Sequence, residues 1–250
     1  MKKNIPGIIF CLFFSVISYF ICKLGFCEKI NLNSLTLAII IGMVFGNLLM
    51  KFIPRKLRYG IKFSGKKILR LGIILYGFRI TFQQIIQVGF DGFFVDIIML
   101  TTTYFIGYYL GTRLFKLDKD LCMLTSIGSS ICGAAAILGT DSMLKAKSHK
   151  VSLAVSTVVL FGTIAMFLYP VLYNIGILPS NVFGIYIGAT VHEVAQVVAA
   201  GSAISSNITD TAVIVKLTRV MMLVPYLFFL GLYLKKKSKT QTAKIPIPWF

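Results

Sequence analysis

Long apolar runs, separated by short polar or basic segments, recur along the whole of this chain. Each run is long enough to cross a bilayer as a helix, because about 20 apolar residues span the hydrocarbon core. A helix also satisfies its backbone hydrogen bonds internally, as lipid requires. The pattern therefore predicts about eight membrane helices, near residues 5–22, 32–50, 71–89, 92–112, 121–140, 151–173, 182–204 and 211–234.

The composition agrees with this pattern and excludes a water-soluble globule. Of the 250 residues, 57% are apolar and 14% are charged, and the mean hydropathy is +0.85. Soluble domains are roughly 45–50% apolar and about 25% charged. We therefore expect an all-α, polytopic transmembrane helix bundle that forms a single integral membrane domain over residues 1–250.

Basic residues outnumber acidic ones, 26 to 8, and gather between the apolar runs. That distribution is typical of membrane orientation and of contact with anionic membrane lipids, and we expect no nucleic acid as a partner. The positive-inside rule places the segment between the second and third runs in the cytoplasm, and alternation then places the N-terminus there too. This segment has eight bases and no acid: Lys51, Arg55, Lys56, Arg58, Lys62, Lys66, Lys67 and Arg70.

Four charged residues fall within or near the predicted spans. Arg79 lies inside the run 71–89, where an arginine stays charged and needs carbonyls, a carboxylate or an anion as a partner. It is therefore either a group that attracts or gates an anion, or half of a structural pair. The others lie nearer to span ends, where long side chains reach the head groups, and we assign structural roles to Asp96, Lys216 and Arg219.

A stretch of small residues interrupts the run 121–140. Small side chains let helices pack closely, which is one explanation. The other is a helix broken around residues 126–137, whose free N–H groups and positive helix start would bind an anion. In that case the donors would come from Ser129, Ser130, Cys132 and Gly133.

A second polar cluster, His192 and Glu193 with Gln196, lies within the run 182–204. The cluster has Gln196 where the zinc motif H-E-x-x-H has its second histidine, so an intramembrane metal-dependent hydrolase is the weaker interpretation. An imidazole beside a carboxylate suits a proton relay or a hydrogen bond to substrate, and a histidine satisfied in the core is the structural alternative. Cofactor motifs are missing too, so we expect no enzymatic activity, cofactor or metal.

Several strings together are similar to one known family, the sulfate exporter family of YeiH-type bacterial inner-membrane proteins. The resemblance extends over most of the chain after residue 70. It implies a multi-pass protein of the bacterial plasma membrane that exports an anion. It also implies a distant likeness to inverted-repeat secondary transporters of the bile-acid/sodium symporter type, whose discontinuous helices form a midplane site. The matching strings are Arg70–Arg79, Gly128–Ile137, Lys145–Lys147, Leu160–Pro170, Gly188–Gly201 and Pro248–Phe250.

Together these observations favour a secondary transporter of a small anion such as sulfate or an organosulfonate, with a coupled proton or sodium ion. The donors of the broken helix would bind the anion, and Arg79 would attract it or lock the bundle. The cluster of His192, Glu193 and Gln196 would form the facing wall and handle the proton. Family members continue with further helices where this chain ends at Phe250, so a non-transporting or C-terminally truncated membrane protein is the alternative.

Overall fold

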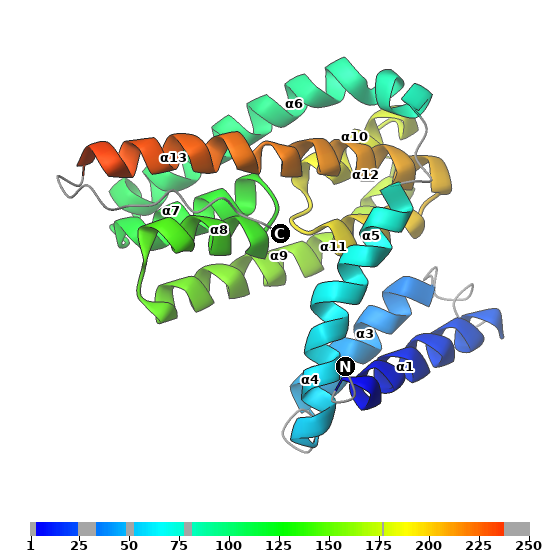
Figure 1. Ribbon diagram of the computed structural model, residues 1–250. Helices are drawn as coiled ribbons and strands as arrows, with labels where there is room; N and C mark the ends of the chain where they lie inside the picture. The colour runs from blue at the N-terminus through cyan, green and yellow to red at the C-terminus, as the bar shows by residue number, and fades with distance from the viewer. Residues whose placement is uncertain (1–3, 25–33, 49–52, 78–81, 177, 238–250) are drawn as a thin grey trace. The chain divides into compact units, whose positions relative to one another are not determined.

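The computed structural model describes residues 4–24, 34–48, 53–77, 82–176 and 178–237. Within these ranges the regular elements are all helical and none is a strand. The all-α prediction is therefore confirmed. The chain divides into two compact units, Met1–Thr81 and Phe82–Phe250, whose helices are labelled in Figure 1.

The first unit is built on a close contact between two helices. α1 is long and apolar enough to cross a membrane, and it packs against α4 where Gly7 meets Gly60. A Cβ added at Gly60 would lie 2.5 Å from the Gly7 Cα, so only glycines let these backbones approach so closely. The elements of this unit are α1 (Ile5–Lys23), α3 (Ser34–Leu48), α4 (Arg55–Phe63), a π-helical turn (Ser64–Ile68) and α5 (Leu69–Gly77).

The second unit contains the longer helical bundle. Among its described residues, three stretches are long and apolar enough to cross a membrane: Gly92–Leu114, Ser148–Asn174 and Ser206–Tyr233. Its elements are α6 (Phe82–Tyr109), a π-helical turn (Leu110–Leu114), α7 (Lys119–Ser130), α8 (Ala134–Leu144), α9 (Ser148–Asn174), α10 (Ser180–Thr190), α11 (Val194–Ser202), α12 (Ser206–Met221) and α13 (Leu223–Lys237). α6 continues through residues 89–92, where the hydrophobic pattern placed a boundary, because isolated glycines weaken a helix without ending it.

Two helical stretches of this unit are interrupted. α7 ends at Ser130 and α8 begins at Ala134, which confirms the predicted broken helix around residues 126–137. Gly133 turns the chain there with φ +70°, a conformation that glycine adopts without a steric penalty. The second interruption separates α10 from α11 and lies inside a run that the hydrophobic pattern predicts as one helix.

Glycines bring the interrupted helices close to their neighbours. Gly107 of α6 and Gly111 of the π-helical turn that follows it face α7, and a Cβ added at Gly107 would lie 2.8 Å from the Ser126 Oγ. Gly188 of α10 faces α12, and a Cβ added there would lie 2.8 Å from the Val215 Cβ. Because van der Waals packing is a principal attraction between helices in lipid, these small residues hold the two interrupted stretches in place.

Candidate functional site

The two interruptions lie against each other, and we call them together the crossing. It consists of Ile131–Gly133 and Val191–Glu193. A Cβ added at Gly133 would lie 3.0 Å from the Glu193 Cγ and 3.6 Å from the His192 carbonyl oxygen. α7 and α10 end here with carbonyls that have no partner within their helix, while α8 and α11 begin here with N–H groups that have none within theirs. The crossing therefore brings together two partly negative and two partly positive helix ends.

Lys216 of α12 donates hydrogen bonds to both of the carbonyl ends. Its Nζ donates hydrogen bonds to the Ile131 carbonyl at 2.6 Å and to the Val191 carbonyl at 2.7 Å. The side chain is fully buried, so these carbonyls take the place of water around the ammonium. Hydrogen bonds from an ionised donor are stronger than neutral ones, and Lys216 thereby ties the ends of α7 and α10 to α12.

Glu193 accepts hydrogen bonds from both of the N–H ends. It forms a capping box with Gln196, in which its side chain accepts from the Gln196 backbone N–H and its own N–H donates to the Gln196 Oε1 at 3.2 Å. The backbone N–H of Ala134, the first residue of α8, also donates to the Glu193 carboxylate. A single carboxylate therefore lies at the starts of both α8 and α11, where negative charge is favourable.

The side chains of His192 and Gln196 complete this side of the crossing. Gln196 is buried, and its Nε2 lies 3.4 Å from both the Val159 carbonyl and the Thr163 Oγ1 of α9. The His192 Nδ1 is buried and has no hydrogen bond to a described residue. A buried ring nitrogen without a partner is unusual and is available to a ligand or a proton.

A second buried cation follows Lys216 on α12. Arg219 donates from Nη1 to the Ala189 carbonyl at the end of α10, and its Nε lies 3.6 Å from the Asp96 Oδ1 of α6. The expectation that Asp96, Lys216 and Arg219 reach the head groups is wrong, because none is more than 1% exposed. These charges lower the local hydropathy and so shift the apparent span ends, although the three side chains lie inside the bundle.

The predicted anion donors of the first interruption have different surroundings. The Ser130 Oγ is fully buried and donates to the Ile127 carbonyl of its own helix at 3.2 Å. Cys132 packs in an apolar cluster with Ile127, Ala136 and residues of α13. Gly133 contacts Glu193. The structure therefore brings Gly133 together with the second polar cluster and directs Ser130 back into its own helix.

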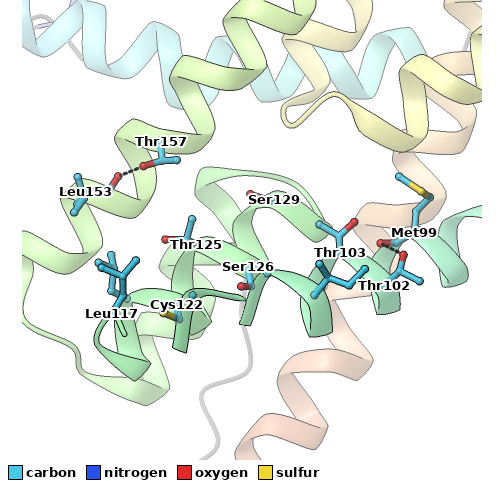
Figure 2. A pocket seen from close by; sticks show the side chains of 14 residues that line it. Met99, Thr102, Thr103, Leu117, Cys122, Thr125, Ser126, Ser129, Leu153 and Thr157 are labelled. Atoms are coloured by element: carbon cyan, nitrogen blue, oxygen red, sulfur yellow. Dashed lines mark hydrogen bonds between the residues drawn. The ribbon is translucent and has the colours of Figure 1, made fainter. Parts of the chain in front are cut away.

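Ser129 lies on the wall of a separate pocket of about 680 Å³ between α6, α7 and α9 (Figure 2). The remaining predicted site residue, Arg79, lies outside the residues that the structure describes. The pocket follows one face of α7, from Leu121 near its start to Ser129 in its last turn. Its lining on α7 therefore ends two residues before the crossing begins at Ile131.

An ion-pair cluster lies at the starts of α7 and α9, and its two carboxylates lie outside the candidate membrane spans. The Lys150 Nζ lies 2.6 Å from the Asp118 Oδ1 and 2.9 Å from the Asp120 Oδ2. Asp118 also caps α7 by accepting from the backbone N–H groups of Asp120 and Leu121. The hydrogen bond from Lys150 lowers the pKa of the Asp118 carboxyl below its ordinary value of 3.8. This cluster joins the start of α9 to the start of α7.

Sequence reasoning missed the second interruption, although a signal for it was present. Glu193 and Gln196 have the spacing of a capping box, which marks the start of a helix. Read in that way, the pair would have divided the run 182–204 at Glu193. The pairing of Lys216 with both interruptions had no comparable local signal, because its partners are 85 and 25 residues away.

Comparison with known proteins gives consistent matches along the chain. The family described as conserved hypothetical protein 698 matches residues 6–250. A UPF0324 membrane protein of Bacteroides thetaiotaomicron is 46% identical over 98% of this chain and 75% of its own length. The UPF0324 inner membrane protein YeiH of Escherichia coli is 50% identical over 87% of this chain and 64% of its own length.

A UPF0324 membrane protein of Pseudomonas aeruginosa is 43% identical over 100% of this chain and 74% of its own length. This chain thus spans less than two thirds of the length of the Escherichia coli relative. No solved structure matches it. The family match, these identities and the apolar helices lead to one conclusion: the chain is a multi-pass membrane protein that belongs to the conserved hypothetical protein 698 family, the YeiH-type family.

Proposed function

We propose that this chain forms part of a secondary transporter that exports a small anion, such as sulfate or an organosulfonate, across the bacterial inner membrane. The crossing is the observation that supports it. Irregular backbone at membrane depth is tolerated only where it is buried in protein or lines a cavity. Discontinuous helices that place their ends at the bilayer midplane are the means by which many secondary transporters bind ions.

Glu193 favours an anion as the substrate. Its carboxylate accepts hydrogen bonds from N–H groups at the starts of α8 and α11, so these donors already hold one negative charge. Helix starts of this kind bind sulfate, phosphate and carboxylate groups. A monoanionic substrate group could take the place of the Glu193 carboxylate without changing the charge that these N–H groups hold.

The same geometry supports a proton as the coupled ion. A protonated Glu193 is a weaker acceptor, so it would leave the two helix starts more readily. The charged and titratable groups around it are Lys216 and Arg219 of α12, Asp96 of α6, Cys132 of the first interruption and the adjacent His192. With both cations and both carboxylates ionised this group is neutral, and protonation of Glu193 gives it one positive charge. An anion would then bind more favourably, so that protonation of Glu193 and binding of the anion are coupled.

The orientation of the chain follows from its charge. We place the N-terminus in the cytoplasm, because the basic segment that includes α4 carries eight bases and no acid between residues 51 and 70. Basic segments at this surface would also contact anionic membrane lipids. The protein would perform no covalent chemistry, so we propose neither an enzymatic activity nor a cofactor.

The test is uptake of sulfur-35-labelled sulfate and methanesulfonate into proteoliposomes, with and without a proton gradient. We expect uptake in the presence of wild-type protein to be accelerated by the gradient. Glu193→Gln should lose this acceleration, because its side chain carries neither the charge nor the proton. His192→Ala should slow uptake. Asp120→Asn, which alters a carboxylate 42% exposed at the surface, is the matched control and should behave as wild type.

One result would refute the proposal. If wild-type protein, shown by protease protection to be inserted, moves neither anion faster than empty liposomes at any gradient, the crossing is not an anion pathway. If Glu193 had only a structural role, Glu193→Gln would unfold at a lower temperature than wild type. Each variant is therefore also compared with wild type by thermal unfolding in detergent.

A further inference from the structure

The pocket beside the crossing differs from it in chemistry. It is about 680 Å³ in volume and is lined by α6, the segment after it, α7 and α9. This volume falls within the roughly 300–1,000 Å³ typical of small-molecule sites. Its lining contains no charged residue, whereas the crossing contains Glu193 and its carbonyls accept hydrogen bonds from Lys216. Figure 2 shows the polar side chains of the pocket scattered among apolar ones.

The hydroxyls of the pocket are of two kinds. Thr102 and Thr157 donate to carbonyls of their own helices, at 2.6 and 2.9 Å, so their hydrogen-bonding capacity is already partly used. Those of Thr103, Thr125, Ser126 and Ser129 make no hydrogen bond to a described residue. The last three lie at helical spacing on the face of α7 that leads to the crossing. The pocket is therefore apolar, with a line of free hydroxyls on one side.

Such walls do not suit an inorganic dianion. Transfer of a charged group from water into surroundings without a counter-charge is strongly unfavourable, and none of the residues that line the pocket is charged. An apolar chain, in contrast, gains free energy when it leaves water for this pocket. A molecule with an anionic head at the crossing and an apolar chain along α7 would match both environments.

We infer that the pocket is the chain-binding part of the substrate site, and that the substrate is an organic monoanion with an apolar chain rather than inorganic sulfate. This inference rests on the proposed function, because it places the anionic head at the crossing. A buried methylene contributes enough to raise affinity about fourfold. Uptake at low concentration should therefore rise about fourfold with each methylene from methanesulfonate to butanesulfonate, and sulfate should be the poorest substrate.

The experiment compares these anions in proteoliposomes that contain wild-type, Thr157→Phe or Leu160→Phe protein. Thr157 lines the pocket from α9, so its replacement by phenylalanine should abolish the dependence on chain length. Leu160 lies one turn further along α9, is 58% exposed and does not line the pocket. Leu160→Phe adds similar bulk outside the pocket and should retain the wild-type series.

A second measurement examines the pocket without transport. Cys122 lines the pocket and has a free thiol. In a background with the other four cysteines replaced by serine, hexanesulfonate should slow modification of Cys122 by N-ethylmaleimide at least fivefold. Equimolar sulfate should leave the rate unchanged. Thr157→Phe should remove the protection, whereas Leu160→Phe should keep it.

The outcomes separate this inference from the proposed function. Equal uptake of sulfate and all alkanesulfonates, with no protection of Cys122, would refute the chain-binding pocket and leave anion transport intact. Protection of Cys122 without any flux would support the pocket as a binding site and refute transport by this chain. The absence of both protection and flux would refute the two together.

Discussion

Replacement of Lys216 by methionine tests whether one side chain holds the crossing together. Methionine has a similar length and shape but cannot donate a hydrogen bond. The substitution removes two hydrogen bonds from a charged donor, to the carbonyls of Ile131 and Val191. Each such bond contributes about 1.5–3 kcal/mol, so the free energy of unfolding should fall by about 3–6 kcal/mol.

Thermal unfolding of the purified protein in detergent, followed with a thiol-reactive fluorophore, measures this loss. For a domain of this size each kcal/mol changes Tm by roughly 2–4 °C, so Lys216→Met should unfold at least about 6 °C below wild type. Lys147→Met changes an exposed lysine and should change Tm by less than about 1 °C, as surface substitutions generally do.

A small effect would refute the reasoning. If Lys216→Met lowers Tm by less than about 2 °C, the ends of α7 and α10 do not depend on this ammonium. The variant no longer buries a charge, and the desolvation penalty that it avoids would then offset the lost hydrogen bonds, as happens for some buried ion pairs. Lys216→Arg separates charge from shape, because it keeps the cation but requires more space. If the hydrogen bonds dominate, its Tm should lie between those of wild type and Lys216→Met.

Three other predictions concern helix packing and charge. Gly188→Ala should lower the free energy of unfolding by about 1–3 kcal/mol through overpacking against α12. Gly42→Ala, with nothing within 4 Å of the added Cβ, should not destabilise the protein, and the Tm of each variant tests these expectations. Gly133→Ala should cost about 1–3 kcal/mol because of the positive φ, with reduced anion flux as the second readout. Lys150 lowers the pKa of the Asp118 carboxyl below 3.8, so the contribution of this ion pair to stability is present above pH 3.8 and is lost as the pH falls through the lowered pKa. Asp118→Asn should keep the cap of α7 and show a smaller loss of Tm on acidification.

The accuracy of sequence-based inference differed between the two interruptions. The first was predictable because its cause is local, namely a glycine-rich stretch in which Gly133 adopts a positive φ. The second has no such glycine at the turn, and hydropathy averages over Val191 and its apolar neighbours. Its local signal was the spacing of Glu193 and Gln196, which hydropathy does not register.

The candidate site was only partly predictable for a similar reason. His192, Glu193 and Gln196 were identified because polar residues are rare in apolar spans. The role of Ser130 was not predictable, since its hydroxyl bonds to its own helix and only coordinates reveal that direction. Lys216 and Arg219 were assigned to span ends because a charge shortens the apparent apolar run, whatever the depth of its side chain in the fold.

By itself, the sequence determined that this chain is an all-α membrane protein with a broken helix near Gly133, because hydropathy and backbone preference depend on neighbouring residues. The tertiary structure alone decided that the two interruptions meet, that Glu193 lies at both helix starts and that Lys216 lies at both helix ends. Those contacts join residues as far as 85 positions apart. Such pairings depend on how α7, α10 and α12 pack in three dimensions, which no local pattern specifies.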